Sequence, residues 1–318
     1  MAEQQFPFAF HTPDKSMKQT EGYGMEFLTV FTPAYNRAHT LPRTYESLCA
    51  QDCKDFIWLI VDDGSFDNTA ELVKQWQAQE NGFKIQYIYK ENGGMHTAHN
   101  TAYENIRTEL NVCIDSDDRM APGAVRKIKA AWEKEQEKGY AGLIGLDADL
   151  STGKVIGKGF PEEMAETTLN GYYAAGGAGD KKLVYRTDVI TSVPPYPVFE
   201  GEKYVGLVYK YTLVDQKYKL AVLDEVLCEV EYQPDGSSNT MWKQYVKNPN
   251  GFAFLRKVNM QYPRSKKRLW IECMHYVSES MLAGNKHFLK ESPKKLQTLL
   301  MIPAGMLLMR YTKKKAGA

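Results

Sequence analysis

Short apolar runs alternate with amphipathic stretches along the chain from Glu26 onward. Residues 27–32, 57–62, 84–89 and 110–115 are rich in Ile, Val, Leu, Phe and Tyr and have the length of strands. Apolar positions recur at helical spacing in residues 41–50, 68–80, 97–106 and 122–138, and Asn68 with Glu71 forms a capping-box pair at the second of these helices. Strands that alternate with helices are typical of βαβ units, so the pattern predicts an α/β domain around a mostly parallel, Rossmann-like sheet.

The pattern changes twice further along the chain. After Tyr140 it is less regular, with glycine-rich turns at residues 157–159 and 176–179 and expected strands at residues 182–185 and 220–231. From Met241 it is helical, basic and rich in Met and aromatic residues. We therefore expect three parts: a flexible leader (residues 1–25), an α/β domain (residues 26–240) and a basic helical region (residues 241–318).

Charge is distributed unevenly along the chain. The composition, 43% hydrophobic and 25% charged among 318 residues, is that of a folded soluble protein and excludes a disordered or multispanning membrane protein. The net charge of +1 conceals a separation, because residues 1–242 hold 24 Lys and Arg against 36 Asp and Glu, whereas residues 243–318 hold 16 against 3. Two regions with different electrostatic tasks are indicated. The five cysteines lack the spacing of a zinc site, which favours a reducing cytosol.

Carboxylates follow the predicted strands. In an open parallel sheet, ligands bind beyond the carboxyl ends of the strands. At three such ends stand the segments Thr32-Pro33-Ala34-Tyr35-Asn36-Arg37, Asp62-Asp63-Gly64-Ser65 and Asp115-Ser116-Asp117-Asp118. So many hard oxygen ligands favour Mg²⁺ or Mn²⁺, with a diphosphate completing the coordination. The alternative is that each Asp caps a helix or a turn, and it stays open for Asp67 and Asp118.

A glycine pair precedes the predicted helix at residues 97–106. Gly93 and Gly94 leave backbone amides able to face a phosphate or carboxylate at a helix N-terminus, although such a pair is more often a simple turn. His96 and His99 lie three residues apart on this helix. They either contact a substrate there or have a structural role.

Taken together, these motifs resemble glycosyltransferase family 2, which has the GT-A fold. The resemblance rests on FLTVFTPAYNR (residues 27–37), VDDGSFDNT (61–69), NGG (92–94) and DSDD (115–118), in this order. The chain is similar in this respect to bacterial sugar transferases that build capsules, exopolysaccharides and O-antigens. The resemblance implies a hexosyltransferase that uses a nucleotide sugar, a UDP-sugar before others, together with Mn²⁺ or Mg²⁺, and that inverts the anomeric carbon.

The same resemblance implies roles for individual residues. Asp117 is expected to be the direct metal ligand, with Asp115 near the ribose and the metal. The donor side is expected to consist of Thr32, Pro33, Tyr35 and Asn36 around the nucleoside, Asp62 and Asp63 near the base, Arg37 near the diphosphate, and Gly93, Gly94, His96, Ser116 and Asp180 elsewhere along the donor.

An inverting transfer needs a base that takes the proton of the acceptor hydroxyl. Many family members present Glu-Asp where this chain reads Glu200-Gly201-Glu202-Lys203, and a charged lysine accepts no proton. Glu202 is our first choice for the base and Glu200 the second; the alternative is that Glu202 is an ordinary surface glutamate. The Gln-x-x-Arg-Trp type signature of processive members is absent, so a single sugar transfer is expected.

The basic region holds an apolar segment, residues 296–311, with lysines on both sides. As a helix its 16 residues would reach about 24 Å, short of a hydrocarbon core of about 30 Å, and Pro303 interrupts it. Positive charge on both sides favours a segment that lies on an anionic membrane surface. The alternative is a core or dimer helix, so homo-oligomerisation stays open. Nucleic-acid binding is not expected, because no recognised module accompanies the charge.

The sequence thus predicts a metal-dependent sugar transferase in the cytoplasm, peripheral at the inner face of the cell membrane. Its expected acceptor is a glycan, lipid-linked, in surface polysaccharide synthesis. A sugar nucleotidyltransferase is the enzymatic alternative, but it would carry a Gly-rich, Arg-containing loop after the first strand. A non-catalytic protein of the same fold that binds nucleotide sugar or carbohydrate is the third hypothesis.

Overall fold

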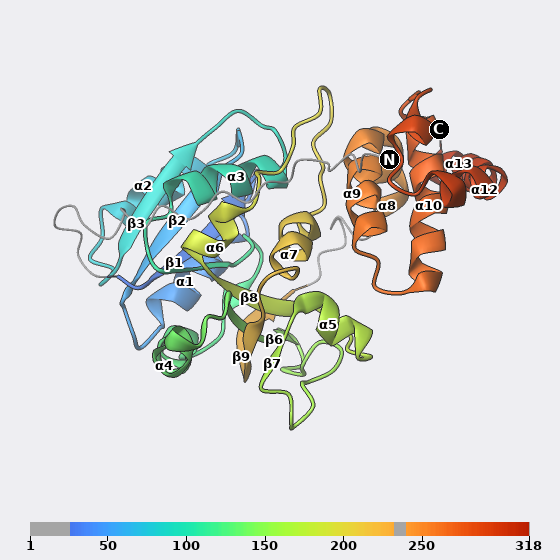
Figure 1. Cartoon of the computed structure of the whole chain (residues 1–318). Coiled ribbons are helices and arrows are strands. Elements are labelled where there is room, and N and C mark those ends of the chain that lie inside the picture. Colours follow the sequence, from blue (N-terminus) through green and yellow to red (C-terminus); the bar gives the residue numbers. More distant parts are fainter. Residues whose placement is uncertain (1–25, 232–239, 318) are drawn as a thin grey trace. The chain divides into compact units, whose positions relative to one another are not determined.

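The computed structural model describes residues 26–231 and 240–317, so the expected leader at residues 1–25 lies outside the described residues. The described chain forms two compact units (Figure 1). The sheet unit comprises residues 26–92, 98–195 and 213–231, and the helical unit comprises residues 93–97, 196–212 and 240–317. Two short segments of the expected α/β domain therefore cluster with the C-terminal helices.

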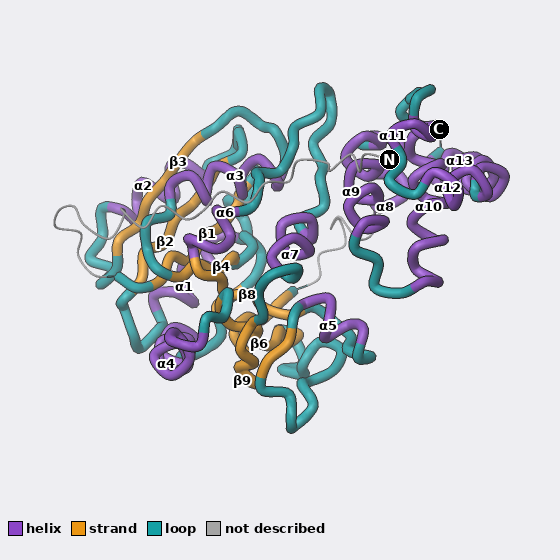
Figure 2. The backbone as a smooth tube through the Cα atoms, viewed as in Figure 1, coloured by secondary structure: helices purple, strands orange, loops and turns teal. Residues whose placement is uncertain are grey.

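The sheet unit is built on one nine-stranded sheet with the order β3-β2-β1-β4-β8-β6-β9-β5, and β7 pairs with β9 (Figure 2). Strands β1 to β4 are parallel, whereas β8 is antiparallel to β4 and β6. The predicted α/β class is confirmed. The strands are β1 (Leu28–Ala34), β2 (Phe56–Asp62), β3 (Lys84–Tyr89), β4 (Leu110–Cys113), β5 (Arg119–Met120), β6 (Gly142–Asp149), β7 (Glu166–Thr167), β8 (Lys181–Arg186) and β9 (Leu220–Val230).

Helices lie against both faces of this sheet. Apolar side chains of α1, α2 and α4 share one buried cluster with Val30, Trp58 and Ile60, which project from one face of β1 and β2. On the other face, Phe31 packs against His99 and Tyr103 of α3, with ring centroids 5.0 and 5.5 Å away. The helices up to the last strand are α1 (Leu41–Cys49), α2 (Thr69–Gln77), α3 (Met95–Asn105), α4 (Ala124–Glu135), α5 (Leu169–Ala174), α6 (Thr187–Ser192) and α7 (Val208–Val214).

The start of α2 differs from the predicted capping box. Asn68 is the N-cap residue, but its side chain makes no capping hydrogen bond. The preceding carboxylate takes that place, because Asp67 accepts hydrogen bonds from the backbone N–H and the hydroxyl of Thr69, at 3.1 and 2.6 Å, and from the N–H of Ala38 at 3.0 Å. Asp67 is thus a turn and helix cap, one of the two alternatives left open for it.

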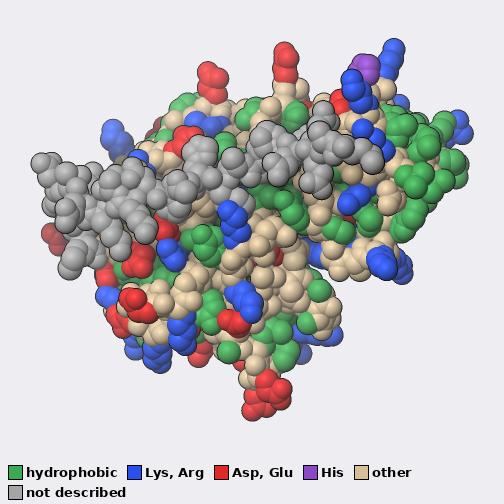
Figure 3. Space-filling view, in the orientation of Figure 1, with side chains coloured by type: hydrophobic (Ala, Val, Ile, Leu, Met, Phe, Trp, Pro, Cys, Tyr) green, Lys and Arg blue, Asp and Glu red, His purple; other side chains and the backbone are tan. Residues whose placement is uncertain are grey.

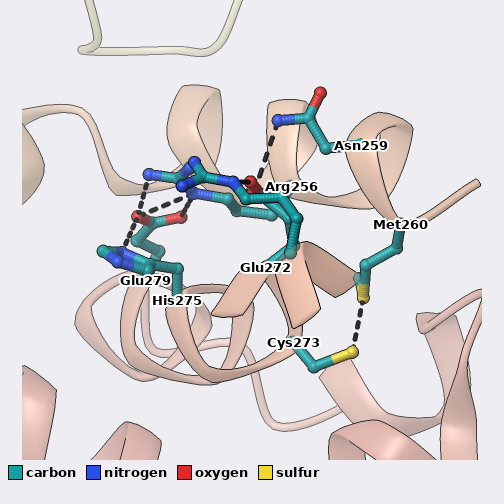
Figure 4. Close-up of polar contacts among 8 residues, drawn as sticks. Arg256, Asn259, Met260, Glu272, Cys273, His275 and Glu279 are labelled. Atoms are coloured by element: carbon teal, nitrogen blue, oxygen red, sulfur yellow. Dashed lines mark hydrogen bonds and ion pairs between the residues drawn. The ribbon is translucent and has the colours of Figure 1, made fainter. Parts of the chain in front are cut away.

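The helical unit is held by a buried ion cluster and by one close helix crossing. Arg256 of α9 lies between Glu272 and Glu279 of α10, with N–O distances of 3.0 and 3.2 Å (Figure 4). At Gly305 of α13 an added Cβ would lie 2.5 Å from Cβ of Val277, so only glycine permits this approach. The helices are α8 (Met241–Lys247), α9 (Pro249–Gln261), α10 (Lys266–Leu282), α11 (Phe288–Glu291), α12 (Lys295–Leu300) and α13 (Ile302–Ala316).

The apolar segment at residues 296–311 is split between α12 and α13, which meet at Met301, two residues before Pro303. Within the described residues, no helix combines the length and the apolar character that crossing a membrane requires.

Candidate functional site

The strand order places a topological switch point between β1 and β4. From β1 the chain continues to β2 and β3 on one side, whereas β4 pairs with the other edge of β1. Register brings the strand ends together: Ala34 lies opposite Asp62, and Phe31 opposite Cys113. Ligands of open α/β sheets bind in the crevice at such a point. The segments after β1, β2 and β4 therefore form the candidate site, as the sequence predicts.

The loops after β1 and β2 are bonded to each other. Asn36 adopts a positive φ of 53°, a left-handed conformation that is uncommon outside glycine and that recurs at functional sites. Its N–H donates to Oγ of Ser65 at 2.8 Å, and its side-chain oxygen accepts from the N–H of Phe66 at 3.0 Å. This arrangement leaves Tyr35 and Phe66 exposed, with ring centroids 6.2 Å apart and edge to face.

The two aspartates at the end of β2 are buried and have internal partners. Asp62 accepts from the N–H of Ser65 at 2.7 Å and from the hydroxyl of Tyr87 at 2.5 Å. Burial and the bond to Asp62 raise the pKa of Tyr87. Asp63 accepts from Nζ of Lys90 at 2.5 Å and from Nδ2 of Asn92 at 3.1 Å. Both carboxylates therefore hold the loop in shape, whatever they contribute to a ligand.

Thr32 and Pro33 lie within β1 and are buried. Oγ1 of Thr32 accepts a hydrogen bond of 3.0 Å from the indole N–H of Trp58, in the core. These two residues are covered, whereas Tyr35 is exposed and Asn36 and Arg37 are half-buried.

The Asp-x-Asp segment directly follows β4. Asp115 and Asp117 are partly exposed, while Ser116 between them is buried. Burial and the charge of Asp115 raise the pKa of Asp117, while Arg37 and Arg43 act in the opposite direction. The charge of Arg37, in the loop after β1, thus acts on Asp117 in the loop after β4.

Lys182 of β8 is a buried cation among these carboxylates, and sequence reasoning missed it. Its Nζ lies 3.8 Å from Asp147 and donates to the carbonyl of Cys113 at 3.4 Å, with 12% of the side chain exposed. Burial raises the pKa of Asp118 to about 7; Lys182 opposes this rise, and Asp115 adds to it. Burial lowers the pKa of Lys182, but Asp147, Cys228 and Asp118 raise it by more than burial lowers it. The pKa of Lys182 therefore lies well above its ordinary value. A lysine at the start of a predicted strand was the available signal.

The donor atoms after β4 fit a hard divalent cation with an incomplete protein shell. Within the described ranges, no group of three or more His, Cys, Asp and Glu side chains is placed to hold a metal ion. The pair Asp115 and Asp117 supplies carboxylate oxygens, the ligands that Mg²⁺ and Mn²⁺ accept, with few protein ligands and the rest from substrate phosphates.

Gly94, the second glycine of the pair, has a structural explanation in the helical unit. Gly94 has a φ of 93°, and an added Cβ would lie 2.0 Å from the carbonyl oxygen of Lys203. Glycine is therefore required here by the approach of another backbone segment, independently of any anion. His96 in the first turn of α3 is buried. The proposed contact of Gly93, Gly94 and His96 with a donor stays a prediction.

The two candidate bases differ in their surroundings within the helical unit. Glu202 is buried and accepts three hydrogen bonds at the N-terminus of α9, from the N–H and Nδ2 of Asn250 and the N–H of Gly251, at 2.9, 2.7 and 2.8 Å. Glu200 is exposed in the preceding turn, and no hydrogen bond or ion pair to another described residue engages its carboxylate. Asp180 is exposed in the turn before β8.

Comparison with known sequences supports the interpretation of these motifs. A family model described as glycosyl transferase family 2 matches residues 29–174. The chain is 28% identical over 172 residues to an uncharacterized glycosyltransferase of Nostoc sp., covering 53% of each protein. It is 28% identical over 121 residues to an undecaprenyl-phosphate 4-deoxy-4-formamido-L-arabinose transferase of Pseudomonas fluorescens, covering 37% of this chain and 34% of that protein. The chain thus spans about half or less of the length of these relatives.

Solved structures share the fold at low identity. Residues 1–349 of S. aureus TarS superpose with a TM-score of 0.54 at 17% identity, over 92% of each chain, and the same fragment is known in complex with UDP. The mannosyltransferase PcManGT from Pyrobaculum calidifontis, in complex with GDP-Man and Mn²⁺, gives a TM-score of 0.52 at 14% identity, over 93% of this chain and 77% of that chain. The chain therefore has the GT-A fold, and its residues 29–174 match glycosyltransferase family 2.

Proposed function

We propose that the chain transfers one sugar, with inversion, from a nucleotide sugar to a glycan acceptor. The observation that carries the proposal is the Asp115-Ser116-Asp117 segment at the end of β4, beside the loop of Arg37 in the switch-point crevice. TarS in complex with UDP and PcManGT in complex with GDP-Man support a nucleotide donor. A UDP-sugar is the first donor to test.

In this proposal the residues around the crevice have separate tasks. Asp117, with Asp115, would hold Mn²⁺ or Mg²⁺, which when bound offsets the charge of the leaving diphosphate. Arg37 adds positive charge on the same side. The exposed rings of Tyr35 and Phe66 offer an apolar surface on which a nucleobase can stack.

For the base, we propose Glu200, because the carboxylate of Glu202 already accepts three hydrogen bonds. Glu200→Gln is expected to lower kcat by about 10²–10⁴-fold, the usual contribution of a general base, and to leave stability unchanged. Glu202→Gln is expected to lower the free energy of unfolding by about 1–3 kcal/mol, because an amide oxygen cannot serve all three N–H donors. Steady-state kinetics and denaturant unfolding of both variants check this. If the Glu202→Gln protein were folded but inactive and the Glu200→Gln protein were active, Glu202 would be the general base.

For the acceptor, we propose a lipid-linked glycan at the cytoplasmic face of the membrane. One similar protein is named as a transferase to undecaprenyl phosphate, a lipid carrier. On α12 and α13 of this chain, large apolar side chains are exposed next to lysines; they are Leu296, Leu299, Leu300, Met306, Leu307 and Tyr311. Such a surface supports peripheral attachment through the helical unit.

A panel of UDP-, GDP- and TDP-sugars tests the donor proposal. With Mn²⁺ present, the true donor is expected to raise the melting temperature of the full chain, since a ligand at 100 times its Kd contributes about 2.7 kcal/mol. Slow metal-dependent hydrolysis of the same sugar nucleotide should accompany binding. Binding without hydrolysis, and without transfer to any glycan acceptor, would instead favour a non-catalytic protein of this fold.

A further inference from the structure

A cationic pocket lies in the helical unit, lined by α11, the two residues before it, and α12. Its volume is about 500 Å³, and it is lined by three lysines, one histidine and three leucines from residues 286–299. The lysines are Lys286, Lys290 and Lys295, and all three are exposed. The lining thus combines positive charge with an apolar wall and contains no carboxylate.

The positive charge of this pocket is not neutralised by its surroundings. Glu291 is the one acidic residue in the sequence from residue 280 to the C-terminus. Its carboxylate is engaged by Lys257, at 3.6 Å, and by Nδ2 of Asn285, at 3.1 Å. Lys286, Lys290 and Lys295 form no ion pair with any residue that the structure describes. They are therefore available to an anion from outside the chain.

The apolar wall of the pocket continues onto the surface. Leu296 and Leu299 line the pocket and are 66% and 49% exposed; Leu300, next in sequence, is 57% exposed, and Leu307 of α13 is 66% exposed. In Figure 3, apolar side chains gather beside Lys and Arg side chains at the end of the helical unit that carries α12 and α13. Exposing such large apolar side chains to water is unfavourable. A ligand with both an anionic and an apolar part therefore fits this surface.

We propose that this pocket binds the phosphate headgroup of an anionic membrane lipid while the adjoining leucines enter the acyl boundary. The proposal deepens the proposed membrane attachment and rests on it. A phosphate accepts hydrogen bonds from several ammonium groups at once, and the apolar wall lies where the lipid chains begin. A second copy of this chain fits less well, because a two-fold contact would bring the two lysine clusters together.

The test compares two charge reversals of equal size in the full chain. The pocket variant is Lys286→Glu/Lys290→Glu/Lys295→Glu, and the control is Lys313→Glu/Lys314→Glu/Lys315→Glu, at the end of α13 and outside the pocket. Each lysine near an anionic surface contributes about 1 kcal/mol, so general attraction falls equally in both. On sedimentation with vesicles of phosphatidylglycerol and phosphatidylcholine, we expect the pocket variant to lose at least about tenfold more binding than the control.

Several results would overturn the proposal. Equal losses would show that the lysines act only as general surface charge. Tight binding of inorganic phosphate that anionic vesicles fail to displace would assign the pocket to a free anion, and a wild-type dimer that the pocket variant abolishes would assign it to a second copy. If the wild-type protein did not bind anionic vesicles, the proposed membrane attachment would also be wrong. Turnover of a sugar nucleotide, measured separately, would still support the transferase proposal. Circular dichroism verifies that both variants are folded.

Discussion

Arg256→Met is expected to lower the free energy of unfolding of the helical unit by about 3–5 kcal/mol. Arg256 is buried, and its guanidinium is bonded to two buried carboxylates, Glu272 and Glu279, at 3.0 and 3.2 Å. Burial lowers the pKa of Arg256, but Glu279 and Glu272 raise it by more than burial lowers it. Arg256 therefore stays charged between the two carboxylates. Without it, two carboxylates stay in the interior with too little positive charge. Urea unfolding of the full chain, followed by far-UV circular dichroism, measures the loss.

Arg268→Met is the matched control, because Arg268 contacts the same Glu272, at 2.6 Å, from a side chain that is 48% exposed. The guanidinium of Arg268 is half exposed and Glu272 keeps its buried partner Arg256, so this variant should lose less stability than Arg256→Met. Replacing Arg256, Glu272 and Glu279 together by apolar residues should recover much of the lost stability, since no charge would then be buried alone. An Arg256→Met protein as stable as the control would contradict this account.

The pH dependence of stability should differ between wild type and Arg256→Met. Burial raises the pKa of Glu272, but Arg256 and Arg268 lower it by more than burial raises it. The pKa of Glu272 therefore lies below its ordinary 4.5. Its ionised form therefore stabilises the wild type above that pH, and this contribution is lost as the pH falls through the lowered value. In the variant one of these two cations is gone, so the pKa of Glu272 should rise, and lowering the pH should cost the variant less stability than it costs the wild type.

Local patterns in the sequence predict much of the sheet unit. Strands β1 to β4 and helices α1 to α4 appear within a few residues of the predicted ranges, because apolar periodicity and turn residues mark them. Strand β6 was missed, since GLIGLDAD is buried except at its last residue and contains two glycines, which weaken a strand pattern. Both glycines are explained only by tertiary contacts: an added Cβ would lie 1.9 Å from the carbonyl oxygen of Val184 at Gly142 and 2.4 Å from Leu227 at Gly145.

The site shows the same limit. The convergence of carboxylates at one edge of the sheet follows from strand ends, which are local, so the sequence predicts it; the switch point depends on the strand order. The surroundings of Glu202 depend on Asn250 and Gly251, which lie almost 50 residues further along the chain and carry no motif that points back to it. The contacts of Lys182 likewise depend on the position of β8 between β4 and β6 in the sheet. Roles that rest on partners distant in sequence need the structure.

Asp117→Asn is expected to separate stability from metal binding. Burial and Asp115 raise the pKa of Asp117, which means that its charge is unfavourable in the metal-free protein. The neutral, isosteric amide removes that repulsion, so the variant should melt at or slightly above the wild-type temperature in EDTA. Added Mn²⁺ together with a nucleoside diphosphate should raise the melting temperature of the wild type and raise that of the variant much less. An equal rise in both proteins would place the metal elsewhere.

The same variant is expected to lose activity by about 10³-fold in kcat/KM. A metal ion supplies several kcal/mol of charge stabilisation to a leaving diphosphate, and each 1.4 kcal/mol or so is a factor of ten in rate. Asp149→Asn is the control: Asp149 lies in the same unit at the end of β6, where it only caps a turn through Ser151 and Thr152, so its activity should match wild type. Initial rates with the donor found in the nucleotide-sugar panel, over a range of Mn²⁺ concentrations, measure the effect. Full activity of Asp117→Asn at an unchanged Mn²⁺ requirement would exclude this carboxylate as the metal ligand and with it the proposed site.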